Sequence, residues 1–307
     1  DGVPGRLLLL CGHDSSSANN PQAAGLSCGA CGGHGGASNA RIAAAILNHA
    51  GVRRALGEAL PADTVAMAGV HDTTTDRVRL LDAAAVPASH RADLARLESA
   101  LSRACASAQA RRAATLPGLD GGDPAAALAR RARDWAETRP EWALAGCAAF
   151  IAAPRSATRG IDLGGRCFLH SYDEGRDAGH ATLELILVAP VVVASWIALG
   201  YHGAVVAPKR WSSGSKTIHN PVGMAGILQG NQGDLAVGPA WQSIHDGDAI
   251  RHDPIRLAVV IHADPAAIDA ILARHPGVGA LFDNGWLTLH AIGDGGLRQR
   301  LAAGTWR

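Results

Sequence analysis

The sequence predicts an α/β protein built on parallel strands, and two stretches of the chain support this prediction. Near the start, an apolar run at 6–11 is followed by a glycine-rich loop, a helical pattern and a second apolar run at 64–70. The order strand, loop, helix, strand is typical of a βαβ unit. Near the end, apolar runs at 256–263 and 285–292 flank a helical pattern at 265–275.

The first βαβ unit is predicted from its residue pattern. The run RLLLLC at 6–11 is continuously apolar, as in a strand buried on both faces. Ser38 or Asn39 is a suitable N-cap for a helix through ARIAAAILNHA, and Gly51 is a suitable stop. The apolar residues on one face of that helix are Ile42, Ile46 and Ala50.

Two histidines follow the two strands of this unit. His13 comes just after the first apolar run, and His71 comes just after the second. Because parallel strands end at the same edge of a sheet, we expect both side chains to lie at that edge. Open parallel sheets bind their ligands there.

The middle of the chain alternates helical, strand-like and loop segments. Residues 90–137 are rich in Ala, Arg and Leu and predict two helices, interrupted at 116–124 by LPGLDGGDP. Further strands are predicted at 146–153 and 166–172. A tract rich in Gly, Asn, Gln and Ser at 211–247 is predicted to be looped.

The length of 307 residues suits one large domain or two ordinary ones. Three regions are expected, namely an α/β core segment, a helical hairpin insertion and a further α/β region with long loops: residues 1–89, 90–140 and 141–307. The chain starts at Asp1 and enters a strand-like run almost at once. We therefore expect it to be the C-terminal part of a longer protein.

Charge and cysteine content narrow the classes of function. The net charge is +1, so electrostatics give no reason to expect a nucleic acid or an anionic membrane surface as partner. Six cysteines are too few for a disulfide scaffold at this length. The clustering of Cys11, Cys28 and Cys31 is more typical of metal or redox chemistry in a reducing compartment.

An uncharged run from Leu185 to Tyr201 raises the question of a membrane. It has 17 residues and contains Pro190, whereas a spanning helix needs about 20 apolar residues. Length and composition therefore favour a buried core element. A re-entrant helix or a helix that faces a partner is the alternative.

The C-x-x-C motif formed by Cys28 and Cys31 allows several interpretations. Such a pair is typical of a zinc knuckle or a redox dithiol. The redox motif normally opens a helix after a strand, whereas this pair lies in a loop. A structural zinc site needs further donors, which Cys11, His13 and His34 could supply, although the spacing matches no standard finger. Alternatively, one cysteine binds a ligand and the other only packs.

Two neighbouring motifs also have alternative interpretations. The stretch GACGGHGG leads toward a helix N-terminus and could hold a small oxyanion, but it lacks the features of a nucleotide-binding loop. The stretch HDTTTD at 71–76 suggests a metal phosphohydrolase, yet the other ligands of such a site are missing. Its simpler interpretation is a turn in which Asp72 and the threonines bond the backbone.

Several long motifs resemble one known family. They are CGHDSSSANNPQAAGLSCGACGG, HDTTTD, RPEWALAGCAAFIAAPR, GGRCFLHSYD, WSSGSKTIHNPVG, GNQGDL, WQSIHDG and DNGWLTLH. These motifs resemble those of the DabA family of inorganic carbon pump subunits, and the resemblance covers essentially the whole chain. It implies a β-carbonic-anhydrase-like parallel-sheet core with helical and loop insertions, of which residues 1–89 form the C-terminal half.

The resemblance also implies a site for Zn²⁺. The family's ligands are a Cys and an Asp from an upstream C-x-D motif, then a His and a Cys fifteen residues apart. His13 and Cys28 match the second pair. The upstream Cys and Asp lie outside this chain, and so does the carboxylate–arginine pair expected beside the metal. The glycines of the loop are expected to let it fold back over the metal.

The function implied is hydration of CO2 to bicarbonate, coupled to cation or proton flow through a DabB-type membrane subunit. The resemblance places the chain at the cytoplasmic face of the inner membrane, held there by that partner. Two alternatives remain. One is a stand-alone zinc-dependent anhydrase or hydrolase, and the other is a structural zinc-binding interaction module.

Overall fold

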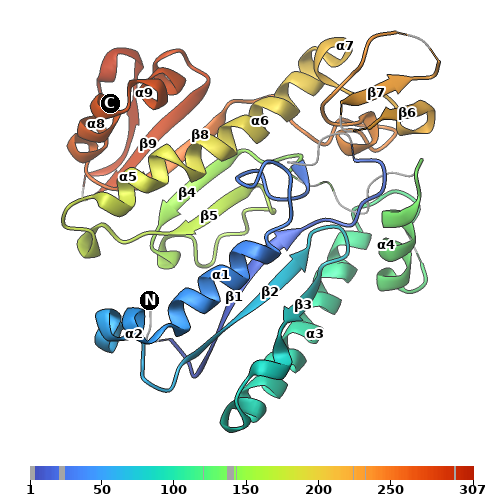
Figure 1. Ribbon diagram of the computed structural model, residues 1–307. Coiled ribbons are helices and arrows are strands. Elements are labelled where there is room, and N and C mark those ends of the chain that lie inside the picture. Colours follow the sequence, from blue (N-terminus) through green and yellow to red (C-terminus); the bar gives the residue numbers. More distant parts are fainter. Residues whose placement is uncertain are drawn as a thin grey trace. The chain divides into compact units, whose positions relative to one another are not determined.

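The computed structural model describes residues 4–20, 25–119, 121–136, 142, 144–223, 225–231, 233–293 and 295–307 (Figure 1). Asp1, the first residue of the expected fragment, and residue 137, the predicted end of the second helix of the insertion, lie outside these ranges. The chain forms two compact units. Unit 1 comprises residues up to 143 together with 216–221, and unit 2 comprises residues 144–215 and 222–307.

Unit 1 contains the predicted βαβ arrangement. Strands β1 (Leu7–Asp14) and β2 (Val65–Asp72) are parallel, and α1 (Ala37–Asn48) connects them. A third strand, β3 (Arg77–Leu81), pairs antiparallel with β2 and gives the order β1-β2-β3. We did not predict β3. The stretch HDTTTD is therefore the end of β2 and the turn of a β2–β3 hairpin.

In this unit, the expected burial of the first strand on both faces was wrong. Strand β1 lies at an edge of the three-stranded sheet, and its four leucines are only half-buried. Helix α1 packs on the sheet through Ala40 and Ala44, while Ile42 and Ile46 are 58% and 51% exposed. Small side chains let the helix approach the strands closely, so the alanine face is the buried one.

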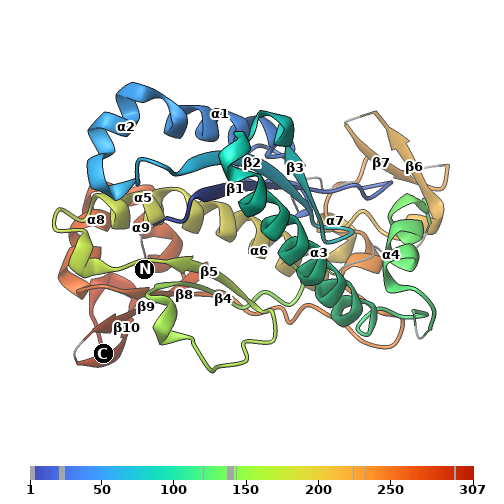
Figure 2. The same ribbon diagram turned by 90° about the horizontal axis from the view of Figure 1, so that it is seen from below.

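The other helices of unit 1 follow the hairpin. They are α2 (Ala50–Leu56), α3 (Arg91–Ala113) and α4 (Pro124–Arg133), the last two being the predicted helical pair. Figure 2 shows α1 and α3 on opposite faces of the sheet. Leu94 and Leu97 near the start of α3 join Met67 of β2 in a small apolar cluster. At its other end, Gln109 donates to the carbonyl oxygen of Thr75 at 2.6 Å.

Unit 2 has a five-stranded sheet in the order β10-β9-β8-β4-β5. The four predicted strands are present and parallel, and β10 is antiparallel at the edge. Their bounds are β4 Ala149–Ala153, β5 Cys167–Ser171, β8 Leu257–His262, β9 Leu287–Gly293 and β10 Gly296–Arg300. One face of β8, β9 and β4 packs against helices to form the largest core of the chain.

The helices on that core are α5 (Ala181–Val188), α6 (Pro190–Val206), α8 (Pro265–Arg274) and α9 (Pro276–Asp283). Helix α8 was predicted, and the Asp264 side chain caps it by accepting from the amide of Ala266. Helix α7 (Pro208–Trp211) ends where the predicted loop tract begins. Among its described residues, the tract contains the short strands β6 (His219–Val222) and β7 (Gly226–Gln229) and 3-10 turns.

The uncharged run lies in α5 and α6, which meet at Ala189 because Pro190 has no amide to continue the first helix. One face is buried in the core, as predicted. The opposite face exposes Leu185, Trp196 and Val206 by 61%, 63% and 56%. Together the two helices form the one candidate span among the described residues that is long and apolar enough to cross a membrane, and 44% of its most apolar window is buried.

Candidate functional site

The carboxyl edge of the β1–β2 pair brings the two predicted histidines together. His13 pairs with His71 in register, and Asp14 pairs with Asp72 one residue further on. Partial burial lowers the pKa of His13, and the neighbouring His71 lowers it further, while Asp14 acts in the opposite direction. His13 is therefore neutral at neutral pH, which is the state of imidazole that binds a metal ion.

The segment from residue 25 to 36, here called the Cys28 loop, folds back onto the end of β1. The amide of Gly36 donates to the carbonyl oxygen of His13 at 2.8 Å. A Cβ atom on Gly12 would lie 2.5 Å from the carbonyl oxygen of Gly36, and a Cβ on Gly35 would overlap the Asp14 carboxylate. The glycine at position 12 is what allows the loop to return beside His13, whereas folding of the loop over a metal stays a prediction.

Cys28 lies in a tight turn within this loop. It forms an isolated bridge with His34, and its carbonyl oxygen accepts from the amides of Cys31 and Gly33. The neighbouring Cys28 side chain is the main cause of a raised pKa at Cys31. Asn39 of α1 donates from Nδ2 to Cys31 Sγ at 3.1 Å.

The role of Asn39 corrects our prediction for the start of α1. The N-cap is Gly36, and no side chain caps the helix. Asn39 lies inside the first turn, where its amide reaches the loop that precedes the helix. The sequence pattern could not reveal this contact, because it depends on how the Cys28 loop folds back.

The amides of the loop do not favour the oxyanion interpretation. Those of Gly32, Gly33, His34 and Gly36 each donate to a backbone carbonyl of the loop or of β1. An anion cradle needs several amides that converge on open space. These four are already used to shape the turn.

Asp72 joins the segment after His13 to the hairpin turn. Its carboxylate accepts from Ser16 Oγ at 2.6 Å, from Thr75 Oγ1 at 2.8 Å and from the Thr74 amide at 3.0 Å. Burial opposes ionisation of Asp72, but these hydrogen bonds outweigh it, and the net pKa is lowered. The contacts support the interpretation of HDTTTD as a turn in which Asp72 and the threonines bond the backbone.

A buried ion pair orients His71. Asp76 is 5% exposed and has a left-handed backbone with φ of 55°. Its Oδ1 lies 2.9 Å from His71 Nε2, and its Oδ2 lies 2.6 Å from a guanidinium nitrogen of Arg112. The paired carboxylate is an acceptor, so Nε2 of His71 carries the proton. Sequence reasoning missed Arg112, since α3 brings it to the site from a distant part of the chain.

The chain beyond Ser17 is also held in place. Asn19 is buried, and its side chain contacts the carbonyl oxygen of Trp135 and Nδ1 of His219. Lys216, at 1% exposure, approaches the carbonyl oxygen of Ala18 at 3.5 Å. Both Lys216 and His219 belong to the short segment that joins unit 1. The only sequence signal for these two residues was the unusual motif WSSGSKTIHNPVG.

His13 and Cys28 are suitable donors for zinc, but two donors make up only part of a site. Imidazole nitrogen and thiolate sulfur are preferred zinc ligands, and a tetrahedral site needs four ligands or three with a water. Across the described ranges, no group of three or more His, Cys, Asp or Glu side chains is placed to hold a metal ion. The two residues supply donor types that suit zinc, and a complete site would need further donors.

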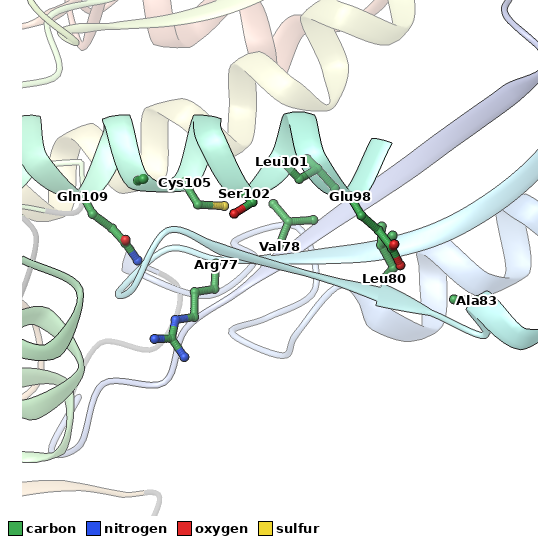
Figure 3. Close-up of a pocket in the computed structure, with 10 residues that line it drawn as sticks. Arg77, Val78, Leu80, Ala83, Glu98, Leu101, Ser102, Cys105 and Gln109 are labelled. Carbon is green, nitrogen blue, oxygen red and sulfur yellow. The ribbon is translucent and has the colours of Figure 1, made fainter. Parts of the chain in front are cut away.

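A separate groove of unit 1 lies between β3 and α3 and has a volume of about 580 Å³. Ser102 and Cys105 of α3 face Val78 of β3 across it (Figure 3). Neither His13 nor Cys28 lines this groove. The candidate site is thus the open edge of the sheet, not this groove.

The fold and the site define an α/β protein with a His- and Cys-bearing edge on a parallel strand pair. The family described as "Probable inorganic carbon transporter subunit DabA" matches residues 4–287, and the chain belongs to this family, as predicted. No solved structure matches the chain.

Curated relatives agree with this assignment. The chain is 53% identical over 306 residues to the "Probable inorganic carbon transporter subunit DabA 1" of Bradyrhizobium sp. strain BTAi1, covering 98% of this chain and 36% of that protein. It is 52% identical over 305 residues to the Roseiflexus castenholzii protein, with the same coverage. It is 54% identical over 295 residues to the Xanthomonas axonopodis pv. citri protein, covering 95% and 36%. The chain thus spans about a third of the length of these relatives.

Proposed function

We propose that this chain is part of an inorganic carbon transporter subunit and supplies two ligands of a zinc site for CO2 hydration. The observation that carries the proposal is the edge of the β1–β2 pair. There His13 ends a strand and the Cys28 loop folds back beside it. Membership of a family whose curated relatives are called inorganic carbon transporter subunits supports the transport role.

The residues around His13 have defined roles in this proposal. A bound zinc ion would supply the Lewis-acid chemistry that makes CO2 hydration rapid near neutral pH. Asp76 and Arg112 hold the His71 ring beside His13. Asp72 ties the serines after His13 to the hairpin turn. Together these contacts fix the edge on which the ligands lie.

The other ligands are proposed to come from a part of the protein outside this chain. Among the described strands, β1 has a partner on one side only, and its four leucines are half-buried. A further parallel strand along this edge would bury those leucines and end beside His13. In this proposal, such a strand belongs to a β-carbonic-anhydrase-like core, and an upstream Cys and Asp complete the site.

A membrane partner is part of the same proposal. Leu185, Trp196 and Val206 form an exposed apolar face on α5 and α6. This face is a suitable contact for a DabB-type membrane subunit, which would hold the protein at the cytoplasmic face of the inner membrane. Ion flow through that subunit would drive hydration in one direction, so that bicarbonate accumulates.

The test uses the full-length protein together with its membrane subunit. His13→Ala and Cys28→Ser should each lower bound zinc severalfold and abolish growth in ambient air of a strain that depends on the pump. Cys105→Ser is the matched control and should leave both unchanged. Ambient-air growth of the Cys28→Ser strain would rule the proposal out.

Two further results would redirect the interpretation. CO2 hydration by the purified protein without a membrane partner would favour a stand-alone anhydrase. Loss of folding, measured by circular dichroism after chelation of the metal, would favour a structural zinc module.

A further inference from the structure

We propose that Cys28 and Cys31 form a reversible disulfide and that this loop is a site of oxidative modification by peroxides. The geometry of the Cys28 loop carries the inference, and the transport role is not needed for it. Its consequence for a bound metal ion does rest on the proposed function.

The two thiols are already placed next to each other. The Cys31 amide donates to the Cys28 carbonyl oxygen at 3.2 Å, which closes a turn across the small residues Gly29 and Ala30. The side chains of the two cysteines lie close enough to interact directly. Both are free thiols and both are partly exposed, so a small oxidant can reach them. Disulfide formation therefore needs little movement of the backbone.

The surroundings hold Cys31 toward its partner. Asn39 Nδ2 donates to Cys31 Sγ at 3.1 Å from the first turn of α1. The loop is fixed at its end by the hydrogen bond from Gly36 to His13. Cys147, by contrast, is buried in unit 2, where a small oxidant reaches it less readily than the thiols of the loop.

The reaction balances with a peroxide as the oxidant. The Cys31 sulfur attacks one peroxide oxygen, the O–O bond breaks, and a sulfenic acid and one water form. The Cys28 sulfur then attacks the Cys31 sulfur and displaces hydroxide, which leaves as a second water after taking the Cys28 proton. Two thiols and hydrogen peroxide thus give one disulfide and two waters. A thiol reductant reverses the step by thiol–disulfide exchange.

The modification would act on the zinc site directly. A sulfur that is bonded to Cys31 can no longer serve as a thiolate ligand, so oxidation would remove Cys28 from the donor set. The proposed zinc ligands include His13 and Cys28 but not Cys31. Cys31 would then be the residue that makes the site sensitive to oxidants.

The test is mass spectrometry of the 307-residue chain after treatment with hydrogen peroxide and alkylation. We expect one disulfide linking Cys28 and Cys31, lost on reduction. Cys31→Ser should abolish it, while Cys105→Ser should leave its yield unchanged. A different cysteine pairing, or two freely alkylated thiols in the loop under conditions that oxidise the exposed Cys11, would overturn the proposal.

A second measurement separates this inference from the proposed function. Zinc bound to the full-length protein should slow disulfide formation at least tenfold, because it occupies the Cys28 sulfur. An unchanged rate in a protein that forms the disulfide would refute the link to the metal and leave the modification site in place. If the protein binds zinc but forms no disulfide after a chelator has removed the metal, the modification site alone would be refuted.

Discussion

At the scale of single residues, the candidate site depends on a close backbone contact between the Cys28 loop and β1. The Cys28 loop returns across β1 where Gly12 and Gly36 meet. No other residue type leaves room for this contact, because a Cβ on Gly12 would lie 2.5 Å from a carbonyl oxygen. Glycine at positions 12 and 36 is therefore a packing requirement of the loop.

Gly12→Ala should destabilise unit 1 by about 1–3 kcal/mol, the usual cost of forcing an extra methyl group into a packed position. The free energy of unfolding from urea titration measures this, with hydrogen exchange of β2 assigning the loss to unit 1. Gly5→Ala is the control, because nothing lies within 4 Å of the added Cβ. Equal stability of the two variants would contradict the close contact.

At the scale of elements, the pair α5–α6 shows why composition alone does not define a role. Its uncharged run predicted a buried element, and one face is indeed buried against the sheet of unit 2. The opposite face is equally apolar but exposed at Leu185 and Trp196. Hydrophobicity around the whole helix gives no periodicity from which the buried face can be identified.

Two leucines of α5 test this division. Leu183 is fully buried, whereas Leu185 is 61% exposed. Leu183→Ala should reduce the stability of unit 2 by about 2–5 kcal/mol, and Leu185→Ala should change it by less than about 0.5 kcal/mol. Hydrogen exchange of the β8 amides reports both values. A large loss for Leu185→Ala in the isolated chain would mean that the outer face is packed.

At the scale of the whole molecule, acid stability should depend on a buried histidine outside the candidate site. His252 is 1% exposed, accepts from the Gly146 amide through Nδ1 at 3.0 Å, and lies against the ring of Tyr201. Burial, with a smaller contribution from His202, lowers its pKa to about 4. The folded state therefore holds His252 neutral at pH values where the unfolded chain binds a proton.

The contribution of His252 to stability is complete above its unfolded pKa of about 6.5 and is lost as pH falls toward 4. We expect unit 2 to lose roughly 3 kcal/mol over this range from this residue. His252→Asn keeps an acceptor for the Gly146 amide but does not titrate, so its stability should depend less on pH. Parallel pH curves for the two proteins, from hydrogen exchange of β8, would refute this.

The sequence by itself determined the α/β class, the parallel βαβ unit and four strands of unit 2, because these depend on local periodicity. It also determined the family, because the chain contains several long and unusual sequence motifs. It also placed His13 and His71 at one edge, because parallel strands end together. Cys28 as a metal ligand remains a prediction.

Only the tertiary structure decided which contacts surround that edge. Arg112 comes from α3, and His219 from a segment beyond unit 2's central helices, so no local pattern joins them to His71 or Asn19. Packing also decided which face of α1 is exposed, because the apolar pattern alone does not say which of two apolar faces contacts the sheet. The strand β3 was likewise recognised only from its pairing with β2. The physical reason is that periodicity is a property of neighbouring residues in the sequence. Burial, in contrast, depends on which distant segments of the chain pack against a residue in the folded protein.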